Sequence, residues 1–160
     1  SRCRATLAAS SEPWVLGKTM RIAIAADHAG YELKEHIKLR LQAEGHVIED
    51  YGVHDTKPAD YPDVGRPAAR AVAHGKADRA VLVDGAGIAM CMVANRISFV
   101  RAAMCDNPHT AEMAREHNDA NVLCLGGRMI GRQMAETILK AFLETEFGER
   151  HQRRVDKIEP

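Results

Sequence analysis

Short apolar runs alternate with amphipathic stretches along most of the chain. The run RIAIAA at 21–26 is mostly apolar and is typical of a buried strand. The next stretch, 30–45, places Leu33, Ile37 and Leu41 four residues apart on one helical face. The same alternation continues beyond it and predicts strands at 46–52, 79–84, 99–105 and 120–127, and helices at 61–76, 85–96, 108–118 and 131–147.

Five alternations of a strand with a helix, joined by short links, favour a parallel sheet that helices cover on both faces. Crossovers between parallel strands are right-handed in nearly all proteins. We therefore expect an α/β domain in three layers, built on a doubly wound, five-stranded parallel sheet of the Rossmann-like kind.

The length and composition indicate one domain. The chain has 160 residues, of which 46% are hydrophobic, so it can bury a sizeable core. Residues 1–19 are rich in Ser and Ala, and we interpret them as an N-terminal extension before a native start at Met20. The extension is either flexible upstream sequence or a segment added for expression. Residues 20–160 are expected to form the single domain, with a basic segment near its C-terminal end.

Charge and cysteine content narrow the classes of function. Lys plus Arg and Asp plus Glu both number 22, and this balance gives no sign of a nucleic-acid or membrane partner. The four cysteines form no CxxC pair, which favours a reducing compartment. No apolar run approaches the roughly 18 residues that a spanning helix needs. We expect a soluble, cytoplasmic protein.

Polar clusters follow three of the predicted strands. They are DHAG at 27–30, DGAG at 84–87 and GGRMIG at 126–131, and a fourth cluster, REHND at 115–119, closes the helix before the last strand. In open α/β sheets the ligand site lies outside the carboxyl ends of the strands. Each cluster also has a structural explanation, because Asp27 could cap a helix and the glycines could serve tight turns. The run RHQRR at 150–154 could be a solvated basic tail.

Taken together, these clusters predict acid/base chemistry on a small phosphorylated molecule. We expect Asp27, Asp84, His28 and His117 to gather with the glycine turns at one edge of the sheet, with arginines nearby. Backbone N–H groups of the turn at 85–89 can stabilise an oxyanion, arginines can hold a phosphate, and carboxylates and imidazoles can move protons. The chain has no dinucleotide or P-loop fingerprint and no Cys/His cluster with ligand spacing, so we expect neither a cofactor nor a metal.

The motifs and their order resemble the type B ribose-5-phosphate isomerases, a family that also includes galactose-6-phosphate isomerase subunits. The resemblance runs from Met20 to about Ile158 and rests on six segments: IAIAADHAGYELK, DYPD, GAG with ANR, REHNDANVL, GGRMIG and RHQRRVDKI. It implies a flavodoxin-like fold and a metal-free aldose–ketose isomerisation through an enediolate. It also implies a homodimer whose sites are built from both subunits, with further pairing into a tetramer left open.

The same resemblance implies roles for individual residues. His117 would open the furanose ring, assisted by Asp27, which would bind the sugar hydroxyls. Asn118 would stabilise the intermediate together with the backbone amides of Gly85, Ala86, Gly87, Ile88 and Ala89. The residues that would contact the substrate, chiefly its phosphate, are His28, Arg128, Arg150 and Arg154, with His151 lining the same region.

Two positions depart from the commonest pattern of the family. Asp84 stands where the family usually has Cys, and Ala86 stands where it has Thr or Ser. Another branch uses a Glu six residues after the Cys position as its base, but this chain has Met90 there. Asp84 is then the proton acceptor that remains in the loop, and we interpret it as the base that moves the proton between C1 and C2.

The expected reaction is the interconversion of ribose 5-phosphate and ribulose 5-phosphate. The lost hydroxyl at Ala86 keeps other substrates open, namely galactose 6-phosphate or a four-carbon sugar phosphate such as erythrulose 4-phosphate. A further alternative is a protein that binds a sugar phosphate without catalysis. The presence of both His117 and Asp27 beside a loop carboxylate argues against that alternative.

Overall fold

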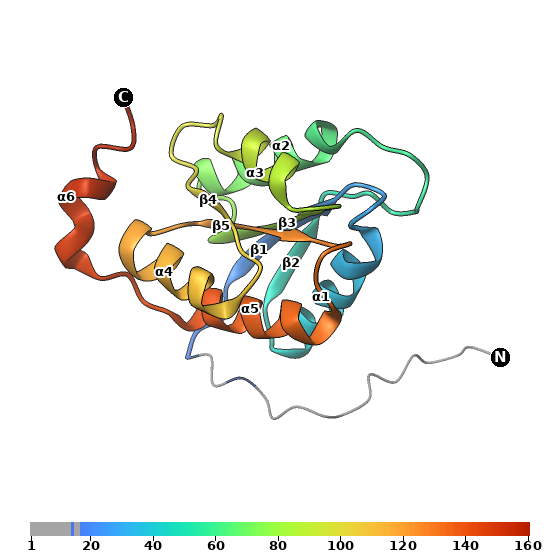
Figure 1. The fold of residues 1–160 in the computed structure, drawn as a ribbon, viewed down its shortest axis with the longest axis horizontal. Coiled ribbons are helices and arrows are strands. Elements are labelled where there is room, and N and C mark those ends of the chain that lie inside the picture. The colour runs from blue at the N-terminus through green and yellow to red at the C-terminus, as the bar shows by residue number, and fades with distance from the viewer. Residues whose placement is uncertain (1–13, 15–16) are drawn as a thin grey trace.

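The computed structural model describes residues 14 and 17–160, which include a five-stranded parallel sheet (Figure 1). Its strand order is β2-β1-β3-β5-β4. Along the chain the elements are β1 (Arg21–Ala26), α1 (Tyr31–Ala43), β2 (Val47–Asp50), α2 (Tyr61–Ala73), β3 (Arg79–Asp84), α3 (Ile88–Ala94), β4 (Ala102–Met104), α4 (Pro108–Asn118), β5 (Val122–Gly126), α5 (Arg132–Glu144), η1 (Glu149–His151) and α6 (Gln152–Val155). The predicted α/β fold with a doubly wound parallel sheet is confirmed.

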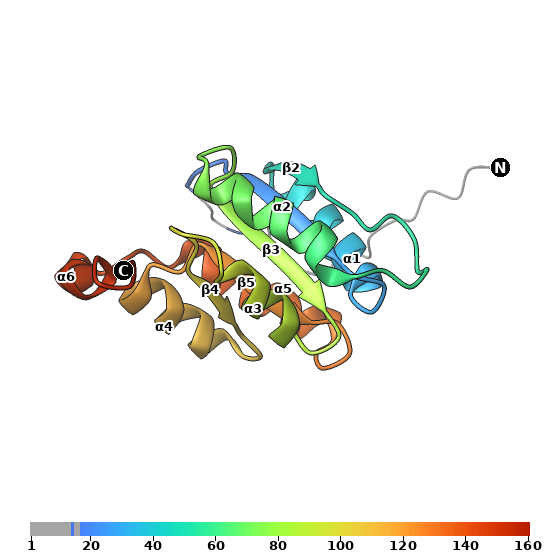
Figure 2. The same ribbon diagram turned by 90° about the horizontal axis from the view of Figure 1, so that it is seen from above.

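Two helical layers cover opposite faces of the sheet (Figures 1 and 2). On one face α1, α4 and α5 pack against side chains of the central strands such as Ile24 and Leu125. On the other face α2 and α3 pack against Ala25 and Leu82. Successive residues of a strand point to opposite faces, so each central strand must be apolar on both. This requirement explains why the strands are nearly continuous apolar runs in the sequence.

The predicted element boundaries, that of β4 included, differ from those of the structure by at most three residues. We predicted a strand over 99–105, but β4 spans only Ala102–Met104. A side chain takes the place of strand pairing before Ala102, because Asn121 Oδ1 accepts the Arg101 N–H at 2.8 Å and Asn121 Nδ2 donates to the carbonyl of Phe99 at 2.9 Å. The longest helices have 13 residues, and none of those described is long and apolar enough to cross a bilayer.

Most of the predicted N-terminal extension, 1–19, lies outside the described residues. Trp14 is described, and its backbone N–H donates to Glu44 at 3.0 Å. The Arg40 guanidinium carbon lies 4.7 Å from the centre of the Trp14 ring. Trp14 therefore contacts the last turns of α1 and packs against the core on that face.

The basic segment near the C-terminus is helical and is attached to α4. The Gly148 N–H donates to the carbonyl of Glu116 at 2.9 Å, and Arg150 pairs with the Glu116 carboxylate at 3.1 Å. Val155 is buried. Figure 1 places α6 beyond the end of α4, at one extremity of the molecule. The segment is thus helical and joined to the end of α4, although most of its basic side chains are exposed.

A buried cluster of ion pairs joins α1 to the end of β2. Lys34 is fully buried, and its Nζ lies 2.8 Å from Glu35 and 2.8 Å from Asp50. Lys38 reaches the same two carboxylates but leaves 22% of its side chain exposed. Burial raises the pKa of Asp50, but the hydrogen bonds from Lys34, Lys38 and the Gly52 N–H outweigh it and lower that pKa. The cluster therefore anchors the start of the loop that leads to α2.

We predict that Lys34→Met lowers the free energy of unfolding by about 2–4 kcal/mol at pH 7, since it leaves two carboxylates around a buried position with one cation fewer. Lys38→Met, the matched control on the same helix, is expected to cost about 0–1 kcal/mol because its pairs are more exposed. Urea denaturation followed by circular dichroism measures both. Because the folded-state pKa of Asp50 is lowered, the Lys34 contribution is present above about pH 4 and is lost as the pH falls further. Equal costs for the two variants would contradict this account.

Candidate active site

The carboxyl ends of β1, β3 and β5 meet at one edge of the sheet. Asp84 at the end of β3 pairs in register with Gly126 at the end of β5. The Asp27 N–H, just after β1, donates to the carbonyl of Val83 at 3.2 Å. The Gly127 N–H donates to the carbonyl of Asp84 at 2.7 Å. The DHAG, DGAG and GGRMIG segments therefore lie together at this edge.

Asp27 orders the turn that follows β1. Its Oδ1 accepts the N–H groups of Ala29 and Gly30, at 3.0 and 3.1 Å, and the residue is buried. A Cβ at Gly30 would stand 2.4 Å from the carbonyl oxygen of Val83, so the turn can lie against β3 only with glycine there. The N-cap residue of α1 is Gly30, so Asp27 closes the turn rather than capping the helix.

Asp84 is a buried carboxylate with one oxygen unused. Its Oδ2 accepts the Ala89 N–H at 3.3 Å, whereas its Oδ1 is buried and without a partner among the described residues. Burial raises the pKa of Asp84, the N–H groups of Ala89 and Met90 oppose the rise, and the Asp27 carboxylate adds to it. The N–H groups at the start of α3 thus favour the ionised form, and no arginine is among the main influences. A buried oxygen without a partner is uncommon and marks a place where a ligand can bind.

The loop between β3 and α3 carries the backbone amides of 85–89 to the same place. Gly87 has φ of +81°, in the left-handed region, and a Cβ there would stand 3.0 Å from the Leu125 carbonyl carbon. The Arg128 N–H donates to the carbonyl of Gly85 at 3.0 Å. A Cβ at Gly85 would lie 3.9 Å from the Cδ of Arg128. The Arg128 side chain is therefore beside this loop.

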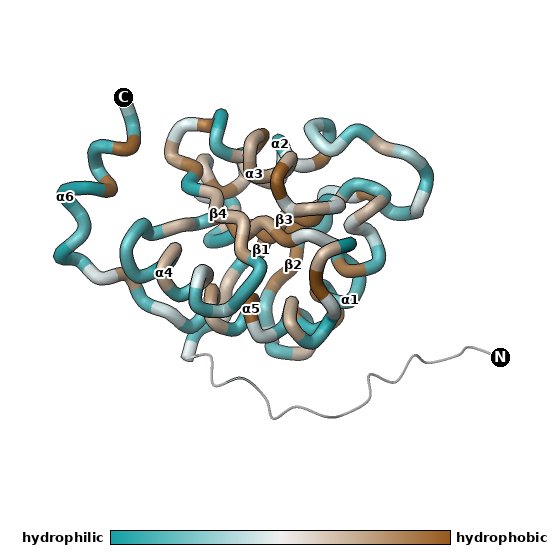
Figure 3. The backbone as a smooth tube through the Cα atoms, viewed as in Figure 1, coloured by the Kyte–Doolittle hydropathy of each residue, from teal (hydrophilic) through white to brown (hydrophobic). Residues whose placement is uncertain are grey.

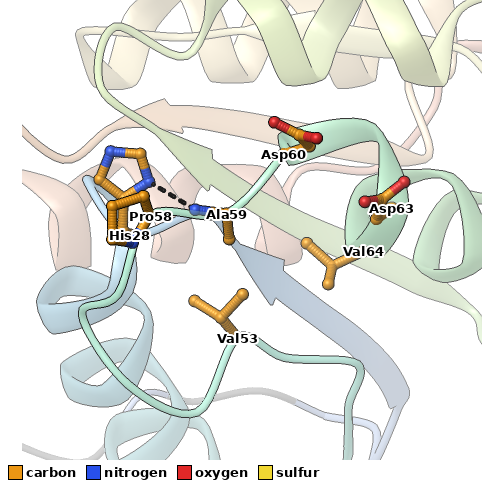
Figure 4. Close-up of a pocket in the computed structure, with 7 residues that line it drawn as sticks. All are labelled: His28, Val53, Pro58, Ala59, Asp60, Asp63 and Val64. Carbon is orange, nitrogen blue, oxygen red and sulfur yellow. Dashed lines mark hydrogen bonds between the residues drawn. The ribbon is translucent and has the colours of Figure 1, made fainter.

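His28 stands between the edge of the sheet and an adjoining cleft (Figure 4). Its Nδ1 accepts the Ala59 N–H at 3.2 Å, so the neutral ring carries its proton on Nε2 and can donate it to a ligand. The cleft has a volume of about 480 Å³. It is lined by His28, Val53, Pro58, Ala59, Asp60, Asp63 and Val64. The sequence pointed to the DYPD motif at 60–63 but not to the rest of this side of the cleft, because nothing in residues 53–59 distinguishes a site from an ordinary loop.

His117 and Asn118 do not lie at this edge, which corrects our expectation that the acids and both histidines gather there. They end α4 and precede β5, whereas the other clusters follow their strands. The next residue, Asp119, pairs at 3.2 Å with Arg101, which stands just before β4. In a parallel sheet, residues that precede strands lie at the amino edge, opposite the carboxyl edge.

His117 lies instead with the C-terminal basic segment. The centres of the His117 and His151 rings are 4.7 Å apart, with an angle of 61° between the ring planes. Burial and the positive charge of Arg150 lower the pKa of His151, and Arg154 acts in the same direction. Two histidines and two arginines thus form a group at the junction of α4 with η1 and α6.

The predicted site residues therefore form two groups in one chain. The carboxyl-edge group comprises Asp27, His28, Asp84, Gly85, Ala86, Gly87, Ile88, Ala89 and Arg128, and the α4–α6 group comprises His117, Asn118, Arg150, His151 and Arg154. Both views place α6 and α1 at opposite ends of the molecule (Figures 1 and 2). In the part of the chain that the structure describes, no cluster of three or more His, Cys, Asp or Glu side chains is arranged to hold a metal ion. Within one folded chain, the carboxylate of Asp84 and the imidazole pair of His117 and His151 therefore lie in different parts of the molecule.

The sequence model of the Ribose/Galactose Isomerase family matches residues 22–158. This chain belongs to that family. Ribose-5-phosphate isomerase B of Escherichia coli is 37% identical over 139 residues, which cover 86% of this chain and 93% of that protein. D-erythrulose-4-phosphate isomerase of Pectobacterium atrosepticum is 41% identical over 141 residues, covering 87% of this chain and 93% of that protein.

Solved structures of the family have the same fold. A ribose 5-phosphate isomerase from Thermotoga maritima superimposes with a TM-score of 0.86 at 42% identity, covering 89% of this chain and 99% of that one. The type B ribose 5-phosphate isomerase of Trypanosoma brucei gives a TM-score of 0.82 at 42% identity, covering 88% of this chain and 97% of that one. Membership of this family makes the chain an aldose–ketose isomerase with a flavodoxin-like fold.

We predict that Asp84→Asn raises the free energy of unfolding at pH 7. Burial raises the pKa of Asp84 in the folded state, so the folded chain binds this proton more tightly than the unfolded chain does. Wild-type stability then falls as the pH rises above about 4, the range in which an unfolded Asp ionises. The increase in the free energy of unfolding caused by Asp84→Asn should therefore appear as the pH rises through this range and vanish in more acidic solution.

Thermal denaturation at several pH values measures this effect, with Asp60→Asn as the control because Asp60 is exposed. The control should show no such pH-dependent gain. If Asp84→Asn unfolds more easily than the wild type at pH 7 but not in acid, then ionised Asp84 stabilises the fold and our explanation of its environment is wrong.

Proposed function

We propose that this chain interconverts ribose 5-phosphate and ribulose 5-phosphate, with residues 20–160 as its catalytic domain. The observation that carries the proposal is the buried Asp84 carboxylate, whose Oδ1 has no partner among the described residues. A structural cap would use both oxygens or leave the free one in water. An unused oxygen in a buried, glycine-lined corner suits a base that meets a substrate.

Asp84 is the base in this proposal. Its Oδ1 would take the proton from C2 of the open-chain aldose, which leaves negative charge on the C1 oxygen of the enediolate. The proton would then return to C1, while the C2 hydroxyl proton moves to the C1 oxygen and C2 becomes the carbonyl carbon. Because burial raises the pKa of Asp84, it is a stronger base than an exposed carboxylate. The backbone amides of Gly85, Ala86 and Ile88 would stabilise the enediolate oxygens, whereas those of Gly87 and Ala89 already act on Asp84. Ala86 contributes no hydroxyl to that task.

Residues of both the carboxyl-edge group and the α4–α6 group would hold the substrate. His28 can donate from Nε2, because its Nδ1 is already occupied by the Ala59 N–H. Arg128 lies beside the loop that follows Asp84. In the α4–α6 group, Arg150 and Arg154 would hold the phosphate, because guanidinium groups form paired hydrogen bonds with its oxygens.

A second copy of the chain would complete each site. His117 and Asn118 lie at the opposite edge of the sheet from Asp84, so ring opening by His117 requires the α4–α6 group of another subunit. Exposed apolar side chains near the β3–α3 loop support such an interface: Ile88 is 49% exposed, Met92 67% and Met129 69%. Surfaces of this kind favour association between chains. We propose a homodimer in the cytoplasm, in which each site uses the carboxyl-edge group of one subunit and the α4–α6 group of the other.

One observation favours a second substrate class. Ala86 lacks the hydroxyl that the commonest family pattern places in the loop, and a relative that is 41% identical carries the name D-erythrulose-4-phosphate isomerase. A four-carbon sugar phosphate is therefore the alternative substrate to test beside ribose 5-phosphate, with galactose 6-phosphate as a third.

We predict that the protein exchanges the C2 proton of ribose 5-phosphate for solvent deuterium and forms ribulose 5-phosphate. NMR in D₂O with a panel of these three sugar phosphates measures both events. Asp84→Asn keeps the shape of the side chain but removes its basic oxygen, so turnover should fall by about 10²–10⁴. Asp84→Cys restores the usual family residue and should keep measurable activity.

The variants separate the possible outcomes. Faster exchange with the four-carbon sugar phosphate than with ribose 5-phosphate would identify the four-carbon compound as the preferred substrate. The proposed mechanism would still hold. Binding of sugar phosphates without any exchange would identify a binding protein and overturn the proposal. Near wild-type turnover in Asp84→Asn would show that another residue is the base.

A further inference from the structure

Two backbone hydrogen bonds fasten the end of β1 to the residues that follow β2. The Ala26 N–H donates to the carbonyl of Gly52 at 2.8 Å, and the Val53 N–H donates to the carbonyl of Ala26, also at 2.8 Å. Asp27 and His28 come directly after Ala26. The position of these two site residues therefore depends on where Gly52 is held.

One carboxylate, that of Asp50 at the end of β2, is tied to both ends of the turn at 27–30. Its Oδ1 accepts the Gly52 N–H at 2.9 Å, which holds the β1 end of the turn. Lys34 Nζ donates to both of its oxygens, at 2.9 and 2.8 Å. Lys34 lies in the first turn of α1, where its own N–H donates to the carbonyl of Gly30 at 2.9 Å. The α1 end of the turn is thus held through Lys34.

The pair that makes this connection is shielded from water. Lys34 is fully buried, and only 15% of the Asp50 side chain is exposed. Charge-assisted hydrogen bonds of this kind are short and directional, and removal of one partner leaves a buried charge unpaired. The stretch that follows, 54–58, is exposed, so its packing cannot hold the turn in place.

His28 is held from two sides. Its backbone belongs to the turn that Asp50 ties, whereas its ring accepts the Ala59 N–H at Nδ1, at 3.2 Å (Figure 4). Ala59 stands just before α2, which packs against the sheet through core residues such as Ala68. A small displacement of the turn would therefore break a hydrogen bond that is already long, and the ring would no longer be fixed with its proton on Nε2.

We propose that Asp50 is a positioning residue of the active site, which keeps Asp27 and His28 in place for the substrate by tying both ends of the turn that carries them. The effect on the substrate rests on the proposed function, whereas the hold on the turn does not. Replacement of a buried ion pair by apolar residues is often neutral for stability, so a role of this pair in fixing geometry is distinct from a role in stability.

Glu35 provides the matched control. Its carboxylate also pairs with Lys34, at 2.8 Å, but it lies on α1 itself and has no described hydrogen bond to residues 51–53. Asp50→Ala and Glu35→Ala each remove one carboxylate from the same buried lysine. Only Asp50→Ala also frees the Gly52 N–H.

NMR of the full chain with ¹⁵N-labelled histidine tests the hold on the turn without an activity assay. Spectra at about pH 8, where an ordinary histidine is mostly neutral, show which ring nitrogen carries the proton, and the His28 signals are identified by their loss in His28→Gln. The wild type and Glu35→Ala should show His28 with its proton on Nε2. Asp50→Ala should show a mixture of the two tautomers, because the hydrogen bond from Ala59 is lost.

Asp50→Asn serves if Asp50→Ala does not fold. It keeps an oxygen for Gly52 but loses the charge that holds Lys34, so it should show the same mixture with a smaller share of the second tautomer. A wild-type His28 signature in the folded Asp50 variant would overturn the proposal. The same mixture in Glu35→Ala would also overturn it, because general loosening of the ion-pair cluster would then be the cause.

Kinetics test the effect on the substrate. If the protein isomerises ribose 5-phosphate, Asp50→Ala should raise KM at least about fivefold and change kcat less than about twofold, because a loss of uniform binding acts on KM. Asp84 is held by β3 and α3 instead of this turn, and Glu35→Ala should change neither constant. An altered His28 with unchanged KM would refute the effect on the substrate. An altered His28 in a protein without isomerase activity would refute the proposed function and leave the hold of Asp50 on the turn confirmed.

Discussion

A parallel sheet holds the carboxyl ends of all its strands at one edge, and this constraint decides what one chain can assemble. Asp27, Asp84 and Arg128 all follow strands, so the sheet brings them together whatever the sequence between them. His117 precedes a strand and is carried to the opposite edge. The reaction that we propose uses both groups, so under that proposal a second subunit has to complete each site.

The burial of the Asp84 carboxylate at the carboxyl edge lowers the stability of the fold when the carboxylate is ionised. A residue with a purely structural role would not need to be placed in this way. Asp84 is 5% exposed, keeps one oxygen without a partner and has its pKa raised by burial. Residues that reduce stability in this way are common at active sites, because a base has to be poorly solvated to be strong. Close packing around the loop fixes this carboxylate in place, as the contacts of Gly30 and Gly87 with neighbouring backbone require.

The sequence was sufficient for the fold and for the place of the carboxyl-edge group within it. Apolar runs that are buried on both faces, such as 21–26 and 79–84, can only be central strands of a parallel sheet, and those predictions are confirmed. It was insufficient where the structure depends on side chains of distant residues. β4 begins later than predicted because the Asn121 side chain bonds the backbone of Arg101 and Phe99, and a propensity for strand gives no sign of that.

The same limit applies to the site. The glycine turns and Asp84 could be placed because they follow strands, and strand ends are set by local pattern. The error at His117 came from treating a polar helix end as part of the same edge, although α4 leads into β5 from the other side. The cleft beside His28 could not be predicted, since it depends on the Ala59 N–H reaching a side chain that is 31 residues away in sequence.

Complementation between two inactive variants tests the central claim, that each site uses the carboxyl-edge group of one chain and the α4–α6 group of another. Asp84→Asn and His117→Ala would be produced in one cell with different affinity tags, and the doubly tagged dimers isolated. Each such dimer has one site with both residues intact and one with neither, so it should regain about half of the wild-type turnover, whereas each variant alone stays inactive. Doubly tagged dimers as inactive as the separate variants would show that Asp84 and His117 serve the same subunit, and the account would be wrong.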